Sequence, residues 1–282
     1  MVILPKLGSD GQEVTITKTG SEWKLESEGK TYKADPSSIK NILAELMRMK
    51  SERVAAVEES KWKEYEVSDS TGTRIELYSN KKMIADLYVG KFDYTQPKGG
   101  QQNPYQQQPK GKMSTYVRPA DDNSVYVVDG FIKMSIQPNV NAYRDKTLLA
   151  CNKEDLTKIT YNYASYENFE LTNENGQWLL DGIPADSIKT SLYLNKLQKI
   201  TSSNFIDDAQ SFSNTPAFQI RVEGNNMLPV DLKAFPTDST NKFIITSSRV
   251  PDAQYSGLKA GLFDRIFVER EKFYSENEDY FK

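Results

Sequence analysis

The sequence predicts an α+β protein made of two tandem copies of one unit, each with a β-hairpin, an amphipathic helix and an antiparallel meander sheet. A Trp-containing hairpin followed by an Ala-Asp helix start occurs twice, at residues 14–49 and 169–200. Short alternating apolar segments follow each helix, a pattern typical of antiparallel strands. A length of 282 residues suffices for two ordinary domains. We therefore expect a first unit over residues 1–152 and a second over 153–282.

The first copy opens with two alternating segments, Val14–Thr17 and Trp23–Glu26, which predict a hairpin. Asp35 and Pro36 follow. An aspartate there can accept hydrogen bonds from the free amides of a first helical turn, and proline suits the first helical position. We therefore expect a helix to begin here. Its apolar face has the spacing of a helix packed on a sheet and comprises Ile39, Ile42, Leu43, Leu46 and Met49.

The second copy repeats this order of features. Residues 169–171 alternate before a turn, Trp178 takes the place of Trp23, and Asp186 takes the place of Asp35. Because both tryptophans precede a helix with an apolar face, we interpret them as packing residues rather than ligand contacts. The second helix is expected to bury Ile188, Leu192, Leu194, Leu197 and Ile200.

Further short strands are expected after each helix. They are residues 74–78, 83–89, 115–118 and 125–128 in the first half, and 218–222, 230–232, 243–246 and 265–268 in the second. A short amphipathic segment, Glu58–Tyr65, connects the first helix to its sheet. Short strands with short connections favour antiparallel meanders that carry helices on one face.

The composition excludes several classes of function. Lys and Arg are scattered among the acidic residues and the net charge is −3, so we expect no nucleic-acid partner. No apolar run approaches the roughly 20 residues needed to cross a bilayer, and the start at Met1–Pro5 is too short for the apolar core of a signal peptide. We expect membrane contact only through an anchor that the given sequence lacks.

The scarcity of reactive side chains argues against catalysis. The sequence has no histidine and one cysteine, Cys151. An intramolecular disulfide and a multi-cysteine metal site are therefore excluded, and the usual general base is missing. We expect a protein without catalytic residues, metal or cofactor, and a hydrolase stays only a minor alternative.

One set of motifs is also found in penicillin-binding enzymes. Ser37 and Lys40 form Ser-x-x-Lys at the helix start, and a Lys-Thr-Gly lies at residues 18–20. In those enzymes Lys-Thr-Gly comes last, whereas here it comes first. We therefore interpret Ser37 as part of a polar helix start.

Two places are candidates for an interaction surface. Residues 95–112 are rich in Gln, Gly and Pro and predict a loop without a core, which is either an insertion at a hairpin tip or a partner-binding loop. The second place is the junction between the halves, where an Arg-Asp pair is a better candidate for fixing the halves than for catalysis. The candidate residues are Tyr105, Gln106, Tyr143, Arg144 and Asp145.

Several segments together resemble a bacterial family known as domain of unknown function 4340. They are Trp23–Asp35 with its helix, Trp62–Val67, Leu87–Lys91, Tyr116–Arg118, Val125–Val128, Arg144–Lys146 with Leu148 and Leu149, and Trp178–Asp186. The resemblance implies an envelope protein, periplasmic or on the outer face of the cytoplasmic membrane. It also implies genes that often lie beside components of gliding-motility-type ABC transporters, and no established catalytic residues.

We accordingly expect a non-enzymatic envelope accessory or scaffold protein whose partners are envelope proteins such as transporter subunits. The alternative is a ligand-binding module that holds a lipid, glycan or peptide in a pocket between the two halves.

Overall fold

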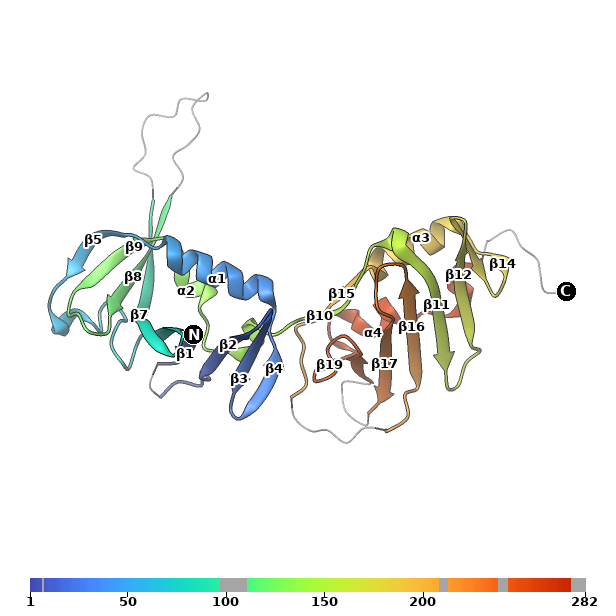
Figure 1. The fold of residues 1–282 in the computed structure, drawn as a ribbon, viewed down its shortest axis with the longest axis horizontal. Helices are drawn as coiled ribbons and strands as arrows, with labels where there is room; N and C mark the ends of the chain where they lie inside the picture. The colour runs from blue at the N-terminus through green and yellow to red at the C-terminus, as the bar shows by residue number, and fades with distance from the viewer. Residues whose placement is uncertain (7, 97–110, 208–212, 238–242, 275–282) are drawn as a thin grey trace, which may run out of the picture. The chain divides into compact units, whose positions relative to one another are not determined.

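The chain forms two compact units, Met1–Asp145 and Lys146–Lys282, which are described separately below (Figure 1). The computed structural model describes residues 1–6, 8–96, 111–207, 213–237 and 243–274. The protein is mostly β with few helices, and each unit contains one large antiparallel sheet, of nine strands in the first and eight in the second. The expected antiparallel sheets are therefore confirmed, while helices contribute less than an α+β class implies.

The first unit places one long helix against its sheet. Its elements are β1 (Val2–Leu4), β2 (Val14–Thr19), β3 (Glu22–Ser27), β4 (Lys30–Lys33), α1 (Pro36–Arg48), β5 (Ser51–Ala56), η1 (Glu59–Lys61), β6 (Thr73–Ser79), β7 (Lys82–Thr95), β8 (Lys112–Pro119), β9 (Val125–Asp129), α2 (Ile132–Ser135) and η2 (Val140–Ala142). The strand order is β4-β3-β2-β1-β6-β7-β8-β9-β5. Helix α1 buries Ile39, Ile42 and Leu46 in the core, as its spacing predicts.

The second unit has a large sheet and a separate two-stranded one. Its elements are β10 (Thr147–Ala150), η3 (Lys153–Asp155), β11 (Leu156–Tyr163), β12 (Phe169–Glu174), β13 (Gln177–Leu180), β14 (Ile183–Pro184), α3 (Ser187–Leu197), β15 (Lys199–Thr201), β16 (Phe218–Gly224), β17 (Val230–Pro236), β18 (Phe243–Ser247), β19 (Gln254–Ser256), η4 (Lys259–Gly261), α4 (Leu262–Ile266) and η5 (Arg270–Phe273). The large sheet has the order β14-β13-β12-β11-β16-β17-β18-β19, and β10 pairs with β15.

The two large sheets have the same order over eight strands. In each, four strands lie before the long helix in sequence and a four-strand meander follows it. The ladders also match: Ile75 faces Leu87 and Leu87 faces Pro119 in the first unit. In the second unit Ile220 faces Leu232, and Leu232 faces Ser247.

The two helix starts have the same construction. The carboxylate of Asp35 accepts a 2.9 Å hydrogen bond from the amide of Ser37, and that of Asp186 accepts one of 2.8 Å from the amide of Lys189. Each aspartate thus satisfies a free amide of the first turn. Trp23 and Trp178 each pack, partly buried, against the core of their unit.

Several expected elements differ in the structure. Helix α3 exposes Ile188 by 71% and Leu192 by 57%, and it buries Thr190 and Tyr193 beside Leu194 and Leu197. The predicted face was wrong at those two positions because the tyrosine ring, with its hydroxyl bonded to a backbone carbonyl, faces the core. The strand expected at residues 265–268 was also wrong, since helix α4 covers its start.

The start of the chain is a strand of the first sheet. Val2–Leu4 form β1, a central strand between β2 and β6, and Ile3 is fully buried. Of the Gln-rich loop expected at 95–112, residues 97–110 lie outside the described residues.

Candidate functional site

A buried arginine organises one face of the first sheet. Arg118 on β8 is only 2% exposed, and its guanidinium carbon lies 3.7 Å from the ring centroid of Trp62 and 4.4 Å from that of Tyr88. Aromatic ring faces attract cations, so the two rings offset part of the cost of burying this charge.

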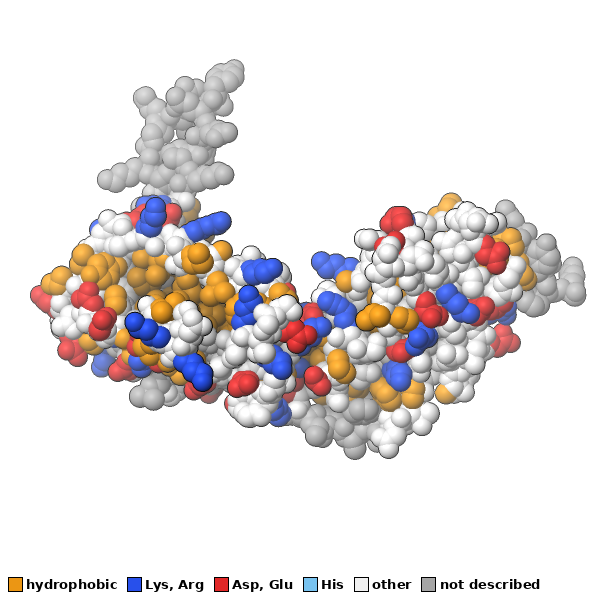
Figure 2. Space-filling model, viewed as in Figure 1, with side chains coloured by type: hydrophobic (Ala, Val, Ile, Leu, Met, Phe, Trp, Pro, Cys, Tyr) orange, Lys and Arg blue, Asp and Glu red, His pale blue; other side chains and the backbone are white. Residues whose placement is uncertain are grey.

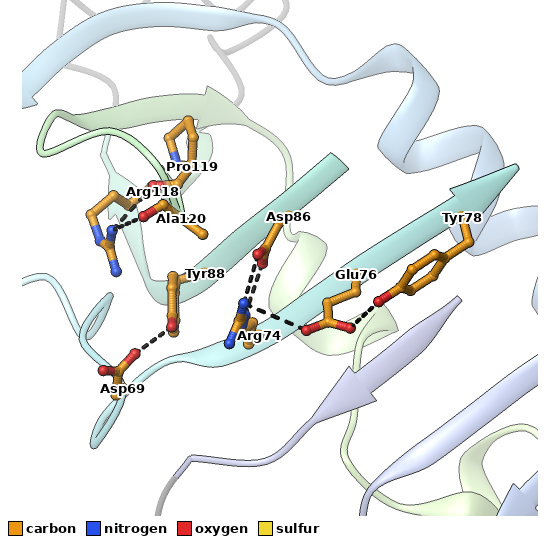
Figure 3. Close-up of polar contacts among 9 residues, drawn as sticks. All are labelled: Asp69, Arg74, Glu76, Tyr78, Asp86, Tyr88, Arg118, Pro119 and Ala120. Atoms are coloured by element: carbon orange, nitrogen blue, oxygen red, sulfur yellow. Dashed lines mark hydrogen bonds and ion pairs between the residues drawn. The ribbon is translucent and has the colours of Figure 1, made fainter. Parts of the chain in front are cut away.

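The N–H groups of Arg118 donate to backbone carbonyls. Its Nε atom donates to Val67 at 3.0 Å, and its Nη1 atom donates to Pro119, Ala120 and Asp122 at 3.1, 3.3 and 3.2 Å. Figure 3 shows the side chain curled back toward the turn that joins β8 to β9. Arg118 therefore fixes the conformation of that turn.

The segment that carries Trp62 packs closely against β7. A side chain at Gly90 would place its Cβ 2.1 Å from the carbonyl oxygen of Tyr65, so this close approach requires glycine. The amide of Lys91 donates to the same oxygen at 3.1 Å, and its ammonium lies 5.2 Å from the ring centroid of Tyr65. The residues around Arg118 are thus held by both backbone and side-chain contacts.

A chain of charged residues continues along β6 and β7 (Figure 3). Arg74 makes a bidentate ion pair with Asp86, at 2.8 and 2.6 Å, and it approaches Glu76 at 3.5 Å. The hydroxyl of Tyr88 donates to the carboxylate of Asp69. The pKa of Tyr88 is raised mainly by burial and also by this hydrogen bond. Because these groups satisfy one another, they have a structural role in this arrangement.

An open apolar groove lies beside the end of α1. Its volume is about 650 Å³, and it is lined by Met49, Ser51, Met83, Ile84, Ala85, Asp86, Leu87, Val117, Pro119, Ala120, Asp121, Tyr126 and Val128. Figure 2 shows hydrophobic side chains gathered over β7, β8 and β9 of this unit. Pro119 and Ala120 also accept the bonds from Arg118, so the buried arginine positions one wall of the groove.

The groove has few charged side chains in its lining. Among the described residues, the acidic ones in its lining are Asp86 and Asp121, and Asp86 is paired with Arg74. Within the described ranges, no group of three or more His, Cys, Asp or Glu side chains is arranged to hold a metal ion. Exposed apolar surface of this kind marks a place where another apolar group can be buried.

The residues named from the sequence as an interaction surface lie elsewhere. Tyr105 and Gln106 fall outside the described residues. Tyr143, Arg144 and Asp145 are all buried.

Each of these three residues makes contacts within the first unit. The hydroxyl of Tyr143 accepts a 2.6 Å bond from the amide of Gln137 and donates at 2.9 Å to its carbonyl. The guanidinium of Arg144 lies 4.2 Å from the ring centroid of Tyr32. Asp145 approaches Lys33 at 3.8 Å.

The serine of the Ser-x-x-Lys motif takes part in the helix cap. The hydroxyl of Ser37 donates to the carboxylate of Asp35 at 2.7 Å, and that of Ser38 donates to the same carboxylate at 2.8 Å. Ser37 therefore has the polar helix-start role expected from its position.

A family model described as "Domain of unknown function (DUF4340)" matches residues 23–99 and 106–216. The chain belongs to the DUF4340 family. The matched ranges contain every residue of the Arg118 cluster and every lining residue of the groove. No curated protein and no solved structure matches the chain.

The DUF4340 segments that looked unconnected in sequence meet in this cluster. Trp62–Val67, Leu87–Lys91 and Tyr116–Arg118 all contribute side chains or backbone groups to it. The alternation of Tyr116 and Arg118 around buried Val117 was the available signal, since it places both polar-tipped residues on one face of β8. Within the described part of the chain, no helix has the length and apolar character needed to span a bilayer.

Proposed function

We propose that this DUF4340 protein is a non-enzymatic accessory or scaffold protein of the bacterial envelope that binds a protein partner through the groove of its first unit. The observation that carries the proposal is the open groove of about 650 Å³, whose lining is mostly aliphatic. Ile84 on its rim is 62% exposed. Contiguous exposed apolar surface on a folded protein is typical of an interaction site.

The neighbouring polar groups support a role without catalysis. Arg118 is bonded to backbone carbonyls, and Arg74 is bonded to Asp86. A general base or nucleophile needs a free, activated side chain that faces substrate. In the groove, the charged groups serve to hold the strands and the β8–β9 turn.

The two units are copies of one ancestral unit. The shared strand order, the matched ladders and the two aspartate-capped helices support this proposal. A duplicated scaffold provides two surfaces that can diverge, and the groove belongs to the first of them.

The partner class is an envelope protein such as a subunit of an ABC-type transport or gliding assembly. The corresponding location is the periplasm or the outer face of the cytoplasmic membrane. Support comes from the envelope context that the resemblance implies; the family model matches residues 23–99 and 106–216.

Site-specific photo-crosslinking in cells tests this function. A photoreactive amino acid replaces Ile84 at the groove and, as the control, Leu228, an exposed leucine just before β17 in the second unit. We expect an adduct with an identifiable transporter or envelope subunit from position 84 and none from position 228. No adduct at position 84, or the same adducts from both positions, would count against the proposal.

An open pocket of the second unit favours a form of the ligand-binding alternative in which the ligand lies within one unit. It has a volume of about 630 Å³, and aromatic rings form much of its lining, including Tyr163, Phe218, Phe263 and Phe267. The lining also carries charged side chains, including Glu167, Asp264 and Arg270, so it suits an amphipathic ligand such as a lipid. Native mass spectrometry of the protein purified from its own cells would show a bound small molecule, and Phe218→Ala should weaken its retention.

A further inference from the structure

We propose that the groove of the first unit is the docking site for an extended apolar strand of a partner polypeptide, which occupies the place that β10 occupies in the second unit. This proposal rests on the proposed protein-binding function and names the form of the partner.

Strand β10 fills a groove of its own unit with two consecutive leucines. Leu148 and Leu149 are both fully buried. The strand pairs antiparallel with β15, so that Leu149 lies opposite Ile200. The hydroxyl of Ser247 on β18 donates a 2.6 Å hydrogen bond to the carbonyl of Leu148. β10 is therefore held by a ladder on one side and by apolar burial and a hydroxyl on the other.

The matched ladders identify the same place in the first unit. Leu232 and Ser247 correspond to Leu87 and Pro119, because each pair is directly opposed and follows an isoleucine in the ladder.

The adjacent ladder gives the next correspondence. Ile245 faces Tyr255, and Tyr255 forms a bridge with Phe205. In the first unit, Val117 faces Tyr126, and Tyr126 faces Val54. Val117 is therefore the counterpart of Ile245.

The residue opposite β10 also has a counterpart. Phe205 lies five residues after Ile200, and Val54 lies five residues after Met49. Met49 therefore corresponds to Ile200, the residue against which Leu149 packs. Each long helix ends shortly before this position, α1 at Arg48 and α3 at Leu197.

All four counterparts line the open groove. They are Met49, Leu87, Val117 and Pro119. The groove therefore lies at the position in the first unit that corresponds to the position of β10 in the second.

Burial differs between the units at two of these four positions. Ile200 and Ser247 are almost completely buried in the second unit, whereas Met49 and Pro119 are only half-buried in the first. Ile200 belongs to a paired strand, whereas among the described residues Met49 has no strand partner. A strand placed here would bury Met49 and extend the pairing, as in β-strand addition.

The chemistry of the occupant follows from the lining. The groove is aliphatic at its centre, so the strand carries leucine-like side chains there. A second cavity of about 420 Å³ also includes Met49 and is lined by charged residues such as Glu45, Arg48 and Lys50. Met49 thus lies between an apolar space and a charged one, which suits a short apolar strand with polar residues at its end.

A labelled peptide tests the proposal on the full chain. The peptide carries residues 144–152 with Cys151→Ser, and fluorescence anisotropy follows its binding. We expect saturable binding, with loss of binding when both leucines of the peptide become aspartate. Met49→Glu in the protein should weaken binding about tenfold or more, while the control Leu228→Glu should leave it unchanged.

Tethering the strand to the protein tests for binding that is too weak to detect between separate molecules. The same nine residues are joined to the chain before Met1 by a flexible linker, which raises the effective concentration of the strand. We expect a higher Tm than for the aspartate-substituted tether, and slower hydrogen exchange at Met49–Ser51. Circular dichroism serves as the control that the Met49→Glu protein is folded.

The outcomes separate this proposal from the proposed function. No binding in either format, equal binding of the aspartate peptide, or insensitivity to Met49→Glu would overturn strand docking. Sedimentation showing that the groove instead joins two copies of the chain would do the same. A crosslinked partner at Ile84 without strand binding leaves the protein-binding function standing, whereas strand binding without any crosslinked envelope protein removes only that function.

Discussion

The backbone amide of Asp35 donates a 2.8 Å hydrogen bond to the carbonyl oxygen of Tyr143. In the second unit, the amide of Asp186 donates a 2.9 Å bond to the carbonyl of Phe273. Both aromatic residues are almost completely buried near the end of their unit. Each unit therefore fastens its last segment to the start of its long helix, which closes the fold around the core beneath that helix.

The side-chain carboxylate of Asp35 caps the same helix start. Burial raises the pKa of Asp35, but the hydrogen bonds from Ser37 and Ser38 outweigh it and hold that pKa below the usual aspartate value. Stability from this group is therefore present above the pKa of an unfolded aspartate and is lost as pH falls through the lower folded value. We expect Asp35→Ala to cost about 1 kcal/mol in urea unfolding at pH 7.

A matched variant separates the cap from its charge. Asp35→Asn retains the oxygen that accepts from the Ser37 amide, so it should lose less stability than Asp35→Ala and should flatten the acid side of the pH profile. An unchanged acid profile in Asp35→Asn would contradict this assignment.

The sequence specified the capped helices well because their signals are local. An aspartate followed by apolar residues at helical spacing defines both a start and a face, and α1 follows that prediction. For α3 the rotation depended on Tyr193, whose hydroxyl finds a partner at Ile266, 73 residues away. No periodicity within the helix contains that information, so Ile188 and Leu192 were wrongly placed in the core.

The candidate site was less accessible from the sequence for the same reason. Arg118 is satisfied by carbonyls such as that of Val67, which any residue type could supply. Short strands such as β1 and β10 also gave too few alternations to be recognised, although Ile3 and Leu149 are fully buried. The groove then depended on knowing where β10 lies, which only the paired ladders reveal.

Replacing Arg118 with lysine tests the cluster. Lysine keeps the charge but loses the planar group between Trp62 and Tyr88 and cannot reach the same set of carbonyls. Buried carbonyls would be left without donors, so we expect a loss of about 2 to 4 kcal/mol in the free energy of unfolding. Urea titration with tryptophan fluorescence measures it.

The control for this substitution is Arg74→Lys. Arg74 is more exposed and pairs with Asp86 near the surface, so its loss should be about 1 kcal/mol or less. Equal losses of unfolding free energy for the two variants would show that the guanidinium of Arg118 contributes no more to stability than that of Arg74. Arg118→Lys should also weaken binding at the groove, because the β8–β9 turn loses its donor.

Gly90→Ala tests the close approach of the Trp62 segment to β7. The added Cβ would meet the Tyr65 carbonyl at 2.1 Å and the Val67 side chain at 2.6 Å. Backbone must shift to admit it, and we expect a cost of about 1 to 3 kcal/mol. Gly20→Ala serves as the comparison, since nothing lies near its Cβ position and only its positive φ opposes alanine. A Gly90→Ala protein as stable as the wild type would refute this packing.

The raised pKa of Tyr143 predicts how the stability of the protein changes at alkaline pH. Burial raises the pKa of Tyr143 to about 12, although the hydrogen bond from the Gln137 backbone lowers it. An unfolded tyrosine titrates near 10, so between about pH 10 and 12 the unfolded chain loses a proton that the folded chain keeps. Stability from this group is complete below pH 10 and is lost as pH rises through that window.

Tyr143→Phe removes this contribution and leaves the Gln137 amide without its 2.6 Å acceptor, at a cost of about 1 to 2 kcal/mol at pH 7. Urea unfolding at a series of pH values should therefore give a shallower alkaline decline for Tyr143→Phe than for wild type, while Tyr166→Phe, at an exposed ring, should keep the wild-type slope. The same alkaline slope in all three proteins would show that the Tyr143 hydroxyl does not hold the end of the first unit in the way its hydrogen bonds indicate.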